Sequence, residues 1–257
     1  MQILVCIDDT DNIDSRGTGE LAEMIMRELE NRGWGKCSWV TRHQLLLDPT
    51  IPYTSHNSSM CFTADILQEH LQSVIDYASE FLKRESVAEA DPGLCVVAIT
   101  DLLDKQSLID FGFKAKREVI TKEEAYNLVE RTHIHLSEHG GNGQGVIGAL
   151  AGAGLRLSRN DGRLKGSLKI NAPDNIITVH NLCLHPAIDE VRSLDEIQVG
   201  DNEIVLLGKL VKPLFINGKA VILVEKVLAD DGQFLWKTCS KNQLSAYEEK
   251  RMYVVSK

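Results

Sequence analysis

Three carboxylates stand within four residues near the start of the chain. Asp8, Asp9 and Asp11 surround Thr10, directly after an apolar run over residues 2–7. Like charges this close destabilise one another unless a cation lies among them. Mg²⁺ prefers such oxygen ligands and often arrives with phosphate oxygens, and α/β folds place ligands where a strand ends before a helix. The pattern predicts a metal site made by the three aspartates; the alternative is a solvated acidic turn in which Asp8 or Asp11 caps a helix.

Two further segments carry residues suited to phosphate. Arg16, Gly17 and Thr18 precede a predicted helix. Glycine lets the backbone approach a ligand, helix N-termini attract anions, and an arginine fork can clamp a phosphate. In the proline-bracketed loop 49–59, His56 and Asn57 are expected to contact phosphate or base, and His56 can also act as an acid or base. The alternatives are an ordinary loop with Thr18 as helix cap, and a surface loop without a function.

A glycine-rich segment, residues 140–145, precedes an apolar helix predicted over 146–155. Its backbone N–H groups are expected to cradle phosphate. The Gly-Lys-Ser/Thr ending of a Walker A loop is missing. A dinucleotide fold is also excluded, because the element before the loop, 121–135, is predicted to be a helix. A flexible hinge is the alternative. The residues expected to form the cradle are Gly143, Gln144 and Gly145.

The histidine and cysteine spacing favours structural roles over metal binding. His135 and His139 are four residues apart, as on one helix face, but Gly140 ends the helix and no third ligand is evident. We therefore interpret them as structural or surface histidines. None of the six cysteines lies within four residues of another, which argues against a zinc ribbon and predicts buried, reduced thiols in a cytoplasmic protein.

Hydrophobic periodicity predicts the elements that position these residues. Strands are expected over 2–7, 37–47, 59–66 and 94–99, and helices over 20–31, 67–84, 105–116, 121–135 and 146–155. From about residue 164 the chain alternates as strands do, without a strong helix. Asn217-Gly218 predicts a hairpin turn between strands 203–211 and 219–227. The predicted fold class is mixed α/β (α+β), with an α/β domain over 1–160 and a smaller β-rich domain of unassigned role over 161–257.

Composition narrows the class of protein. Hydrophobic residues make up 43% of the 257 residues and the net charge is −9. A sizeable core can form, and no apolar run approaches the 18 residues of a membrane span. The N-terminus is expected to be a first strand, not a signal peptide. An acidic chain repels nucleic-acid backbones outside a basic patch, and the nearest basic stretch, Arg156 to Lys169, is modest. A compact substrate is therefore favoured.

Taken in order, these segments resemble the archaeal tRNA-Ile 2-agmatinylcytidine synthetases over about residues 1–155. The resemblance implies a kinase-like domain that cleaves ATP and phosphorylates the C2 carbonyl of a wobble-position cytidine, after which agmatine displaces the phosphate. It also implies a ferredoxin-like domain, an oligonucleotide-binding barrel and a zinc ribbon. The segments that carry the resemblance are Ile7-Asp8-Asp9-Thr10-Asp11, Arg16-Gly17, Pro49-Thr50-Ile51-Pro52-Tyr53-Thr54-x-x-Asn57, Asp91-Pro92-Gly93 and Gly143-x-Gly145-x-Ile147-Gly148-Ala149-Leu150-Ala151.

The sequence departs from that family in three respects. The similarity ends after Ala151, and no cysteine ribbon follows. The family's phosphorylated threonine falls at or near Glu20, with Thr18 the nearest hydroxyl, and a carboxylate does not accept a phosphoryl group in the same stable way. His56 stands where the family has an arginine, so the bidentate grip on phosphate is lost.

The sequence thus predicts an ATP- and Mg²⁺-dependent enzyme that activates a substrate oxygen by phosphoryl or adenylyl transfer. The aspartates would hold metal and orient phosphates, while Arg16 and His56 neutralise charge on the transferring group. The expected partners are ATP and an acceptor that is a small molecule or a tRNA base; an oligomer is compatible with the sequence. The alternatives are a genuine tRNA cytidine-modifying ligase with a shortened C-terminal half and a non-catalytic nucleotide sensor or regulator. The expected nucleotide contacts are Thr10, Arg16, Gly17, Thr18, Asn57, Gly143, Gln144 and Gly145.

Overall fold

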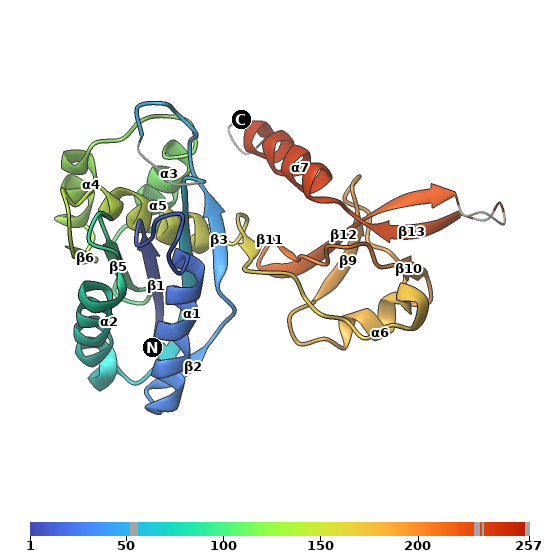
Figure 1. Cartoon of the computed structure of the whole chain (residues 1–257), viewed down its shortest axis with the longest axis horizontal. Helices are drawn as coiled ribbons and strands as arrows, with labels where there is room; N and C mark the ends of the chain where they lie inside the picture. The colour runs from blue at the N-terminus through green and yellow to red at the C-terminus, as the bar shows by residue number, and fades with distance from the viewer. Residues whose placement is uncertain (52–55, 229–231, 233, 255–257) are drawn as a thin grey trace. The chain divides into compact units, whose positions relative to one another are not determined.

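The computed structural model describes residues 1–51, 56–228, 232 and 234–254. It contains two compact units, Met1–Lys165 and Gly166–Lys257 (Figure 1). The strands of the first unit are β1 (Gln2–Asp8), β2 (Gly35–Cys37), β3 (Thr41–Gln44), β4 (Ser58–Ile66), β5 (Gly93–Ala98), β6 (His135–Glu138) and β7 (Arg163–Leu164). Its helices are α1 (Thr18–Asn31), η1 (Gln68–His70), α2 (Leu71–Glu85), α3 (Lys105–Lys114), α4 (Lys122–Val129) and α5 (Gly145–Leu157).

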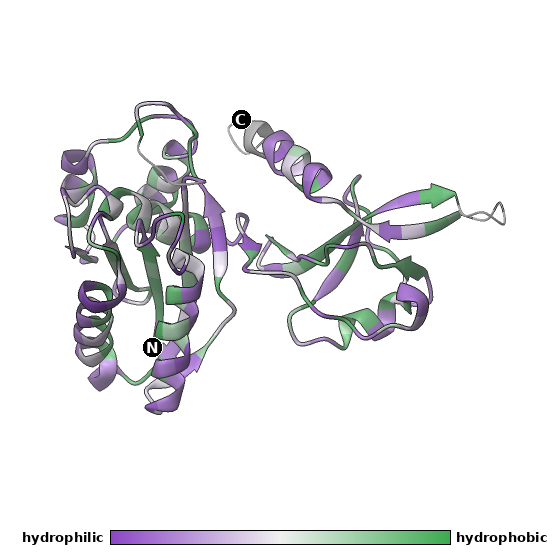
Figure 2. Ribbon diagram, viewed as in Figure 1, coloured by the Kyte–Doolittle hydropathy of each residue, from purple (hydrophilic) through white to green (hydrophobic). Residues whose placement is uncertain are grey.

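The first unit is a sheet covered by helices on both faces. The strand order is β6-β5-β1-β4-β3-β7, with β2 also on β4, and these neighbours pair antiparallel. Ile3, Val5 and Ile7 of β1 pack in the core with α1 and α2, while Leu4 and Cys6 pack in the core with α3 and α5. Figure 2 shows the resulting pattern of hydrophobic central strands and hydrophilic outer helix faces.

Antiparallel pairing brings several strand ends to one edge of this sheet. Near the end of β1, Ile7 lies opposite Met60 of β4 and Asp8 lies opposite Gly93 of β5. At the same edge, Gly93 faces Glu138 at the end of β6, and Gln44 at the end of β3 faces Ser58. Side chains alternate along a strand, so Asp8 extends to the same face as Leu4 and Cys6, where α5 packs.

The second unit has strands and a core of its own. The strand order is β11-β12-β13-β10-β8, with β9 also on β12; β9 runs parallel to β12 and β10 parallel to β13. Its core includes Leu182, Val205 and Ile222. The elements are η2 (Pro173–Asn175), β8 (Ile176–Thr178), α6 (Val179–Cys183), β9 (Glu190–Ser193), β10 (Ile204–Leu206), β11 (Leu214–Ile216), β12 (Lys219–Leu228), β13 (Phe234–Thr238) and α7 (Lys241–Val254).

The mixed α/β class with a smaller β-rich second part is confirmed, and several predicted elements are corrected. The strand expected over 37–47 is two short strands, β2 and β3. The helix expected over 121–135 ends at Val129, and β6 begins at His135, after a turn in which His133 has φ 57°. The edge of β5 offers β6 a pairing partner, and this long-range contact overrides local helix propensity.

The second unit also differs from expectation. It contains two helices, α6 and α7, although no strong helix was expected there. Asn217 and Gly218 form the predicted hairpin turn, with φ of 51° and 75°. However, the turn joins β12 to β11, whereas only residues 204–206 of the expected strand 203–211 form a strand.

The structure also bears on the cysteines and on membrane insertion. All six cysteines are unpaired with one another, and four of them are buried, as expected. Among the helices that the structure describes, none is long and apolar enough to cross a membrane.

Candidate functional site

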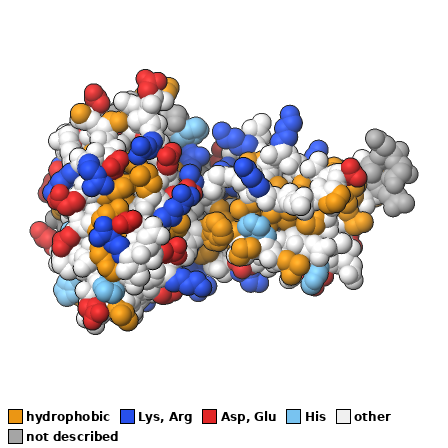
Figure 3. All heavy atoms as spheres, turned by 60° about the horizontal axis from the view of Figure 1, so that its bottom comes forward, with side chains coloured by type: hydrophobic (Ala, Val, Ile, Leu, Met, Phe, Trp, Pro, Cys, Tyr) orange, Lys and Arg blue, Asp and Glu red, His pale blue; other side chains and the backbone are white. Residues whose placement is uncertain are grey.

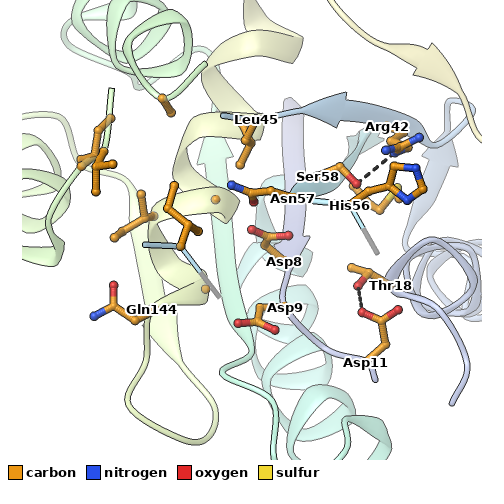
Figure 4. A pocket seen from close by; sticks show the side chains of 18 of the residues that line it. Asp8, Asp9, Asp11, Thr18, Arg42, Leu45, His56, Asn57, Ser58 and Gln144 are labelled. Atoms are coloured by element: carbon orange, nitrogen blue, oxygen red, sulfur yellow. Dashed lines mark hydrogen bonds between the residues drawn. The ribbon is translucent and has the colours of Figure 1, made fainter. Parts of the chain in front are cut away.

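A cavity of about 590 Å³ opens at the sheet edge where β1 ends. In Figure 4, Asp8 and Asp9 lie in the middle of the view, with Arg42 and His56 on one side and Gln144 on the other. The predicted site residues that line the cavity are Asp8, Asp9, Asp11, Gly17, Thr18, His56, Asn57, Gln144 and Gly145. The structure thus brings together residues from all four segments that the sequence singled out.

The aspartates at the end of β1 disfavour one another's ionised forms. Burial, and then the charge of Asp9, raises the pKa of Asp8 to about 8. Burial, followed by the charges of Asp91 and Asp11, raises the pKa of Asp9 to about 6. Asp9 also has φ 51°, in the left-handed region, which non-glycine residues adopt only at some cost. The fold therefore holds carboxylates together in a cavity where added positive charge would stabilise them.

Two helices begin at the cavity. Gly17 and Thr18 at the start of α1, and Gln144 and Gly145 at the start of α5, all line it. The positive ends of the two helix dipoles attract anions. Thr18 Oγ1 donates to Asp11 Oδ1 at 2.9 Å, which fixes the acidic turn to the start of α1.

The glycine-rich loop is held in place by Asp91. The Asn142 backbone N–H donates to Asp91 Oδ1 at 2.5 Å, and the Gly145 N–H donates to the Asp91 carbonyl oxygen at 3.1 Å. Gly143 adopts φ 77°, a conformation that favours glycine. The element before this loop is the strand β6, not the expected helix. Because β6 pairs antiparallel with β5, the described part of the first unit still lacks the parallel strands of a dinucleotide-binding fold.

Sequence reasoning missed Arg42, a cation that Figure 4 shows beside the predicted site. Arg42 lines the cavity; its Nε donates to Ser58 Oγ at 2.9 Å and its Nη2 to Gln44 Oε1 at 2.7 Å. In a strand whose residues alternate between apolar and polar, an arginine cannot be told by sequence from an ordinary solvent-facing residue. Only the register of β3 on β4 shows that it points to the site.

An apolar wall was also missed. The predicted helix 105–116 ends at Lys114, and the following segment turns along the cavity. The Leu46 backbone N–H donates to the Ala115 carbonyl oxygen at 3.1 Å and so joins this segment to the chain after β3. The apolar lining residues are Leu45, Ile51, Met60, Ala115, Val119, Ile120 and Ile147. We call the lining at the end of β1 the acidic end, and the lining formed by Leu45 and the 115–120 segment, which also contributes Glu118, the apolar end.

Three predicted residues lie beside the cavity without lining it. Thr10 is buried and donates to Thr18 Oγ1 at 3.0 Å. Arg16 forms an ion pair with Glu85 at 3.2 Å, and Gly143 stands next to lining residues. Pro52, Tyr53, Thr54 and Ser55 of the proline-bracketed motif lie outside the described residues.

The two histidines considered for metal are not on a helix. His135 Nε2 and His139 Nε2 lie 2.9 and 2.8 Å from the Ser137 hydroxyl, on and just after β6. Over residues 1–51, 56–228, 232 and 234–254, no group of three or more His, Cys, Asp or Glu side chains is arranged to hold a metal ion by itself. Mg²⁺ is usually held by one or two carboxylates together with waters and phosphate oxygens, and the donors of Asp8 and Asp9 fit that arrangement.

The basic stretch from Arg156 to Lys169 does not form a continuous exposed patch. Arg156 is buried and donates to Ser38 Oγ at 3.2 Å, while Lys165 pairs with Glu23 at 3.0 Å. On the face in Figure 3, positive and negative side chains of the first unit are interspersed.

The likeness indicated by the motifs is confirmed by comparison with known proteins. The tRNA-Ile 2-agmatinylcytidine synthetase of Methanosarcina acetivorans is 30% identical over 162 residues, which are 61% of this chain and 36% of that protein. The synthetase of Pyrococcus horikoshii is 29% identical over 160 residues, 62% of this chain and 37% of that protein. The match thus spans little more than a third of these relatives. No family model matches the chain.

The fold is also shared with a solved synthetase structure. The crystal structure of an agmatidine synthetase in complex with its isoleucine tRNA and ATP has a TM-score of 0.54 and 20% sequence identity, and the match covers 97% of this chain and 55% of that chain. The likeness in fold therefore extends beyond the segment that shows sequence similarity.

Proposed function

We propose that this chain is an ATP- and Mg²⁺-dependent enzyme that activates an oxygen of its substrate by phosphoryl or adenylyl transfer. The observation that carries the proposal is the presence in one cavity of Asp8 and Asp9, whose ionised forms are disfavoured, and of two helix N-termini. The carboxylates are stabilised by positive charge, whereas the helix N-termini are stabilised by negative charge. A phosphate bound to a metal ion supplies both.

The two ends of the cavity suit the two ends of a nucleotide. We assign the triphosphate to the acidic end, between the starts of α1 and α5, and the base to the apolar end formed by Leu45 and the 115–120 segment. The proposal is supported by the relatives, which are named as tRNA-Ile 2-agmatinylcytidine synthetases, and by the solved synthetase complex, which contains ATP.

Each polar residue has a distinct task in this scheme. A bound Mg²⁺ would supply positive charge to the phosphates and to Asp8, Asp9 and Asp11. The positive ends of the α1 and α5 dipoles attract the phosphate oxygens, and Arg42 stabilises negative charge that develops on the transferring group. His56 extends into the cavity beside Arg42 (Figure 4), where it can neutralise charge or move a proton at the acceptor oxygen.

A second candidate is a tRNA cytidine-modifying ligase. It is favoured by the fold likeness to the tRNA-bound synthetase, which runs through the second unit as well as the first. Glu20, at or near the family's phosphorylated threonine, is exposed and lies 3.9 Å from Arg16. In this chain the proposed reaction therefore proceeds without phosphorylation at that position.

Calorimetry with ATP, with and without Mg²⁺, followed by product analysis, tests the proposal. We expect Mg²⁺-dependent binding that Asp9→Asn and Asp11→Asn abolish, and that Asp14→Asn, an exposed neighbour, leaves unchanged. AMP among the products, in the presence of tRNA, would support the ligase; ADP alone would support simple phosphoryl transfer. Binding without turnover over a panel of small acceptors and tRNA would instead support a nucleotide sensor. Absence of ATP binding by the wild-type chain would refute the proposal.

A further inference from the structure

A buried charged cluster lies outside the cavity lining and has no part in the proposed reaction. His43 is on β3, Lys116 follows α3 and Asp161 follows α5; their side chains are 0%, 7% and 11% exposed. Buried charges are costly unless each finds a partner. A cluster retained at that cost is a candidate for setting the geometry of the segments it joins.

One carboxylate serves two partners in this cluster. Asp161 Oδ1 lies 2.9 Å from His43 Nδ1, and Asp161 Oδ2 lies 2.5 Å from Lys116 Nζ. Burial alone would raise the pKa of Asp161, but the charge of Lys116 and the hydrogen bond with His43 outweigh it and hold the pKa well below its usual range. Asp161 is therefore ionised and occupied on both oxygens.

The His43 ring is fixed in this position from other sides as well. Its Nε2 lies 2.8 Å from Thr41 Oγ1. Gly162 follows Asp161 with φ 108°, and a Cβ atom there would lie only 2.6 Å from the ring Cε1. The segment that carries Asp161 thus passes directly against the imidazole, so a movement of this segment would move β3 with it.

Both partners of Asp161 are direct neighbours of cavity residues. Arg42 and Leu45, on either side of His43 in the sequence, line the cavity; because side chains alternate along a strand, Arg42 faces the site while His43 faces Asp161. Lys116 follows Ala115 and precedes the lining residues 118–120. Asp161 is therefore a common anchor for the two walls that form the apolar end.

We propose that Asp161 is a positioning residue that sets the separation between the β3 wall, through His43, and the 115–120 wall, through Lys116. The inference rests on the proposed nucleotide function, because these are the walls assigned to the base. Asp161 does not itself line the cavity, so it acts on the ligand only through the residues it holds.

Asp161→Asn and Lys116→Met test this role. Asparagine keeps the shape and an acceptor for His43 but removes the charge that holds Lys116, whereas Lys116→Met removes the other partner. We expect each variant to bind ATP and AMP about tenfold more weakly, because a wall displaced by a fraction of an ångström misplaces the base. Mg²⁺-dependent binding of inorganic tripolyphosphate should fall by less than nucleotide binding, because tripolyphosphate lies at the acidic end and meets the β3 wall only at Arg42. Asp195→Asn, an exposed aspartate of the second unit, is the charge-matched control and should bind all three ligands as the wild type does.

Equal losses of nucleotide and tripolyphosphate binding would indicate general damage and overturn the proposal. A second measurement does not depend on any ligand. The Leu46 amide, which donates to the Ala115 carbonyl oxygen across the two walls, should exchange its hydrogen faster in both variants, while amides of β1 keep their rates. Unchanged protection at Leu46 would also overturn the proposal. If the wild-type chain binds no nucleotide, the proposed function fails, and exchange at Leu46 still decides whether Asp161 joins the walls.

Discussion

The carboxylate of Asp8 occupies the space that a side chain at Gly148 would need. A Cβ atom built on Gly148 would lie 1.6 Å from Asp8 Oδ2 and 2.6 Å from its Cγ. Gly148 is in the first turn of α5, and Asp8 ends β1. The helix backbone therefore covers the carboxylate directly, which accounts for the burial that raises the pKa of Asp8.

Gly148→Ala should separate these two elements. The added methyl group can be accommodated only if Asp8 or α5 shifts, and overpacking of this kind costs about 1–3 kcal/mol. We expect a lower free energy of unfolding in urea and a loss of Mg²⁺-dependent ATP binding. Gly200→Ala is the control, because a Cβ there would meet only Glu203 Cγ at 3.9 Å. Wild-type stability and binding in Gly148→Ala would contradict the packing described here.

Asp8→Asn should stabilise the ligand-free protein while it weakens metal binding. With its pKa near 8, Asp8 must bind a proton on folding at pH 7, whereas asparagine is neutral in both states. We expect the free energy of unfolding to rise by on the order of 1 kcal/mol and Mg²⁺-dependent ATP affinity to fall. Thermal unfolding without ligand and calorimetry with ATP measure the two effects, and a variant less stable than the wild type would contradict the prediction.

Arg42→Gln should remove positive charge from the phosphate end of the cavity. Because Arg42 is assigned to the transferring phosphoryl group, we expect ATP affinity to fall about tenfold and AMP affinity to change less, a difference typical of a charged hydrogen bond. Arg27→Gln on the exposed side of α1, where Arg27 pairs with Glu23 at 3.6 Å, should change neither affinity. Equal losses for ATP and AMP in Arg42→Gln would contradict the assignment.

The stability of the first unit should depend on pH through His139. Burial, followed by Lys83 and His135, lowers the pKa of this half-buried ring to about 4, below the value of about 6.5 in an unfolded chain. As pH falls, the unfolded chain therefore binds this proton before the folded protein does. The contribution of neutral His139 to the free energy of unfolding is complete above about pH 6.5 and is lost towards pH 4.

His139→Gln removes this titration and keeps a partner for Ser137. Between pH 7 and 5 we expect the wild type to lose about 1 kcal/mol more unfolding free energy than the variant, an amount reduced from the full shift because the ring is partly exposed. Urea unfolding at the two pH values measures the difference. Parallel losses in the two proteins would show that His139 is not responsible.

Local sequence patterns predicted the elements in which hydrophobic periodicity matches the observed burial. The apolar run before Asp8 gave β1, and the spacing of Leu21, Ile25 and Leu29 gave α1, since these residues are buried on one face. The carboxylates and the glycine-rich loop could be assigned to one site because each sits at the end of an element, and ends gather at the edge of a sheet.

The parts that sequence reasoning missed depend on long-range contacts. Arg42 reaches the site through the register of β3 on β4, and Ala115 through its hydrogen bond with Leu46; the sequence around each residue gives no signal of these contacts. His135 was assigned to a helix because its pairing with Val96 of β5 is not visible locally.

The gathering of strand ends at one edge has a consequence for how this site can diversify. The carboxylates and the helix N-termini are fixed by the sheet and by the glycine contacts of α5, whereas residues 45–51, 56–57 and 115–120 lie between elements and contribute lining residues from outside the sheet. Insertions or substitutions in these connections change the shape of the apolar end without shifting the acidic end. The architecture thus separates the part of the site that holds the charged groups from the part whose shape can change.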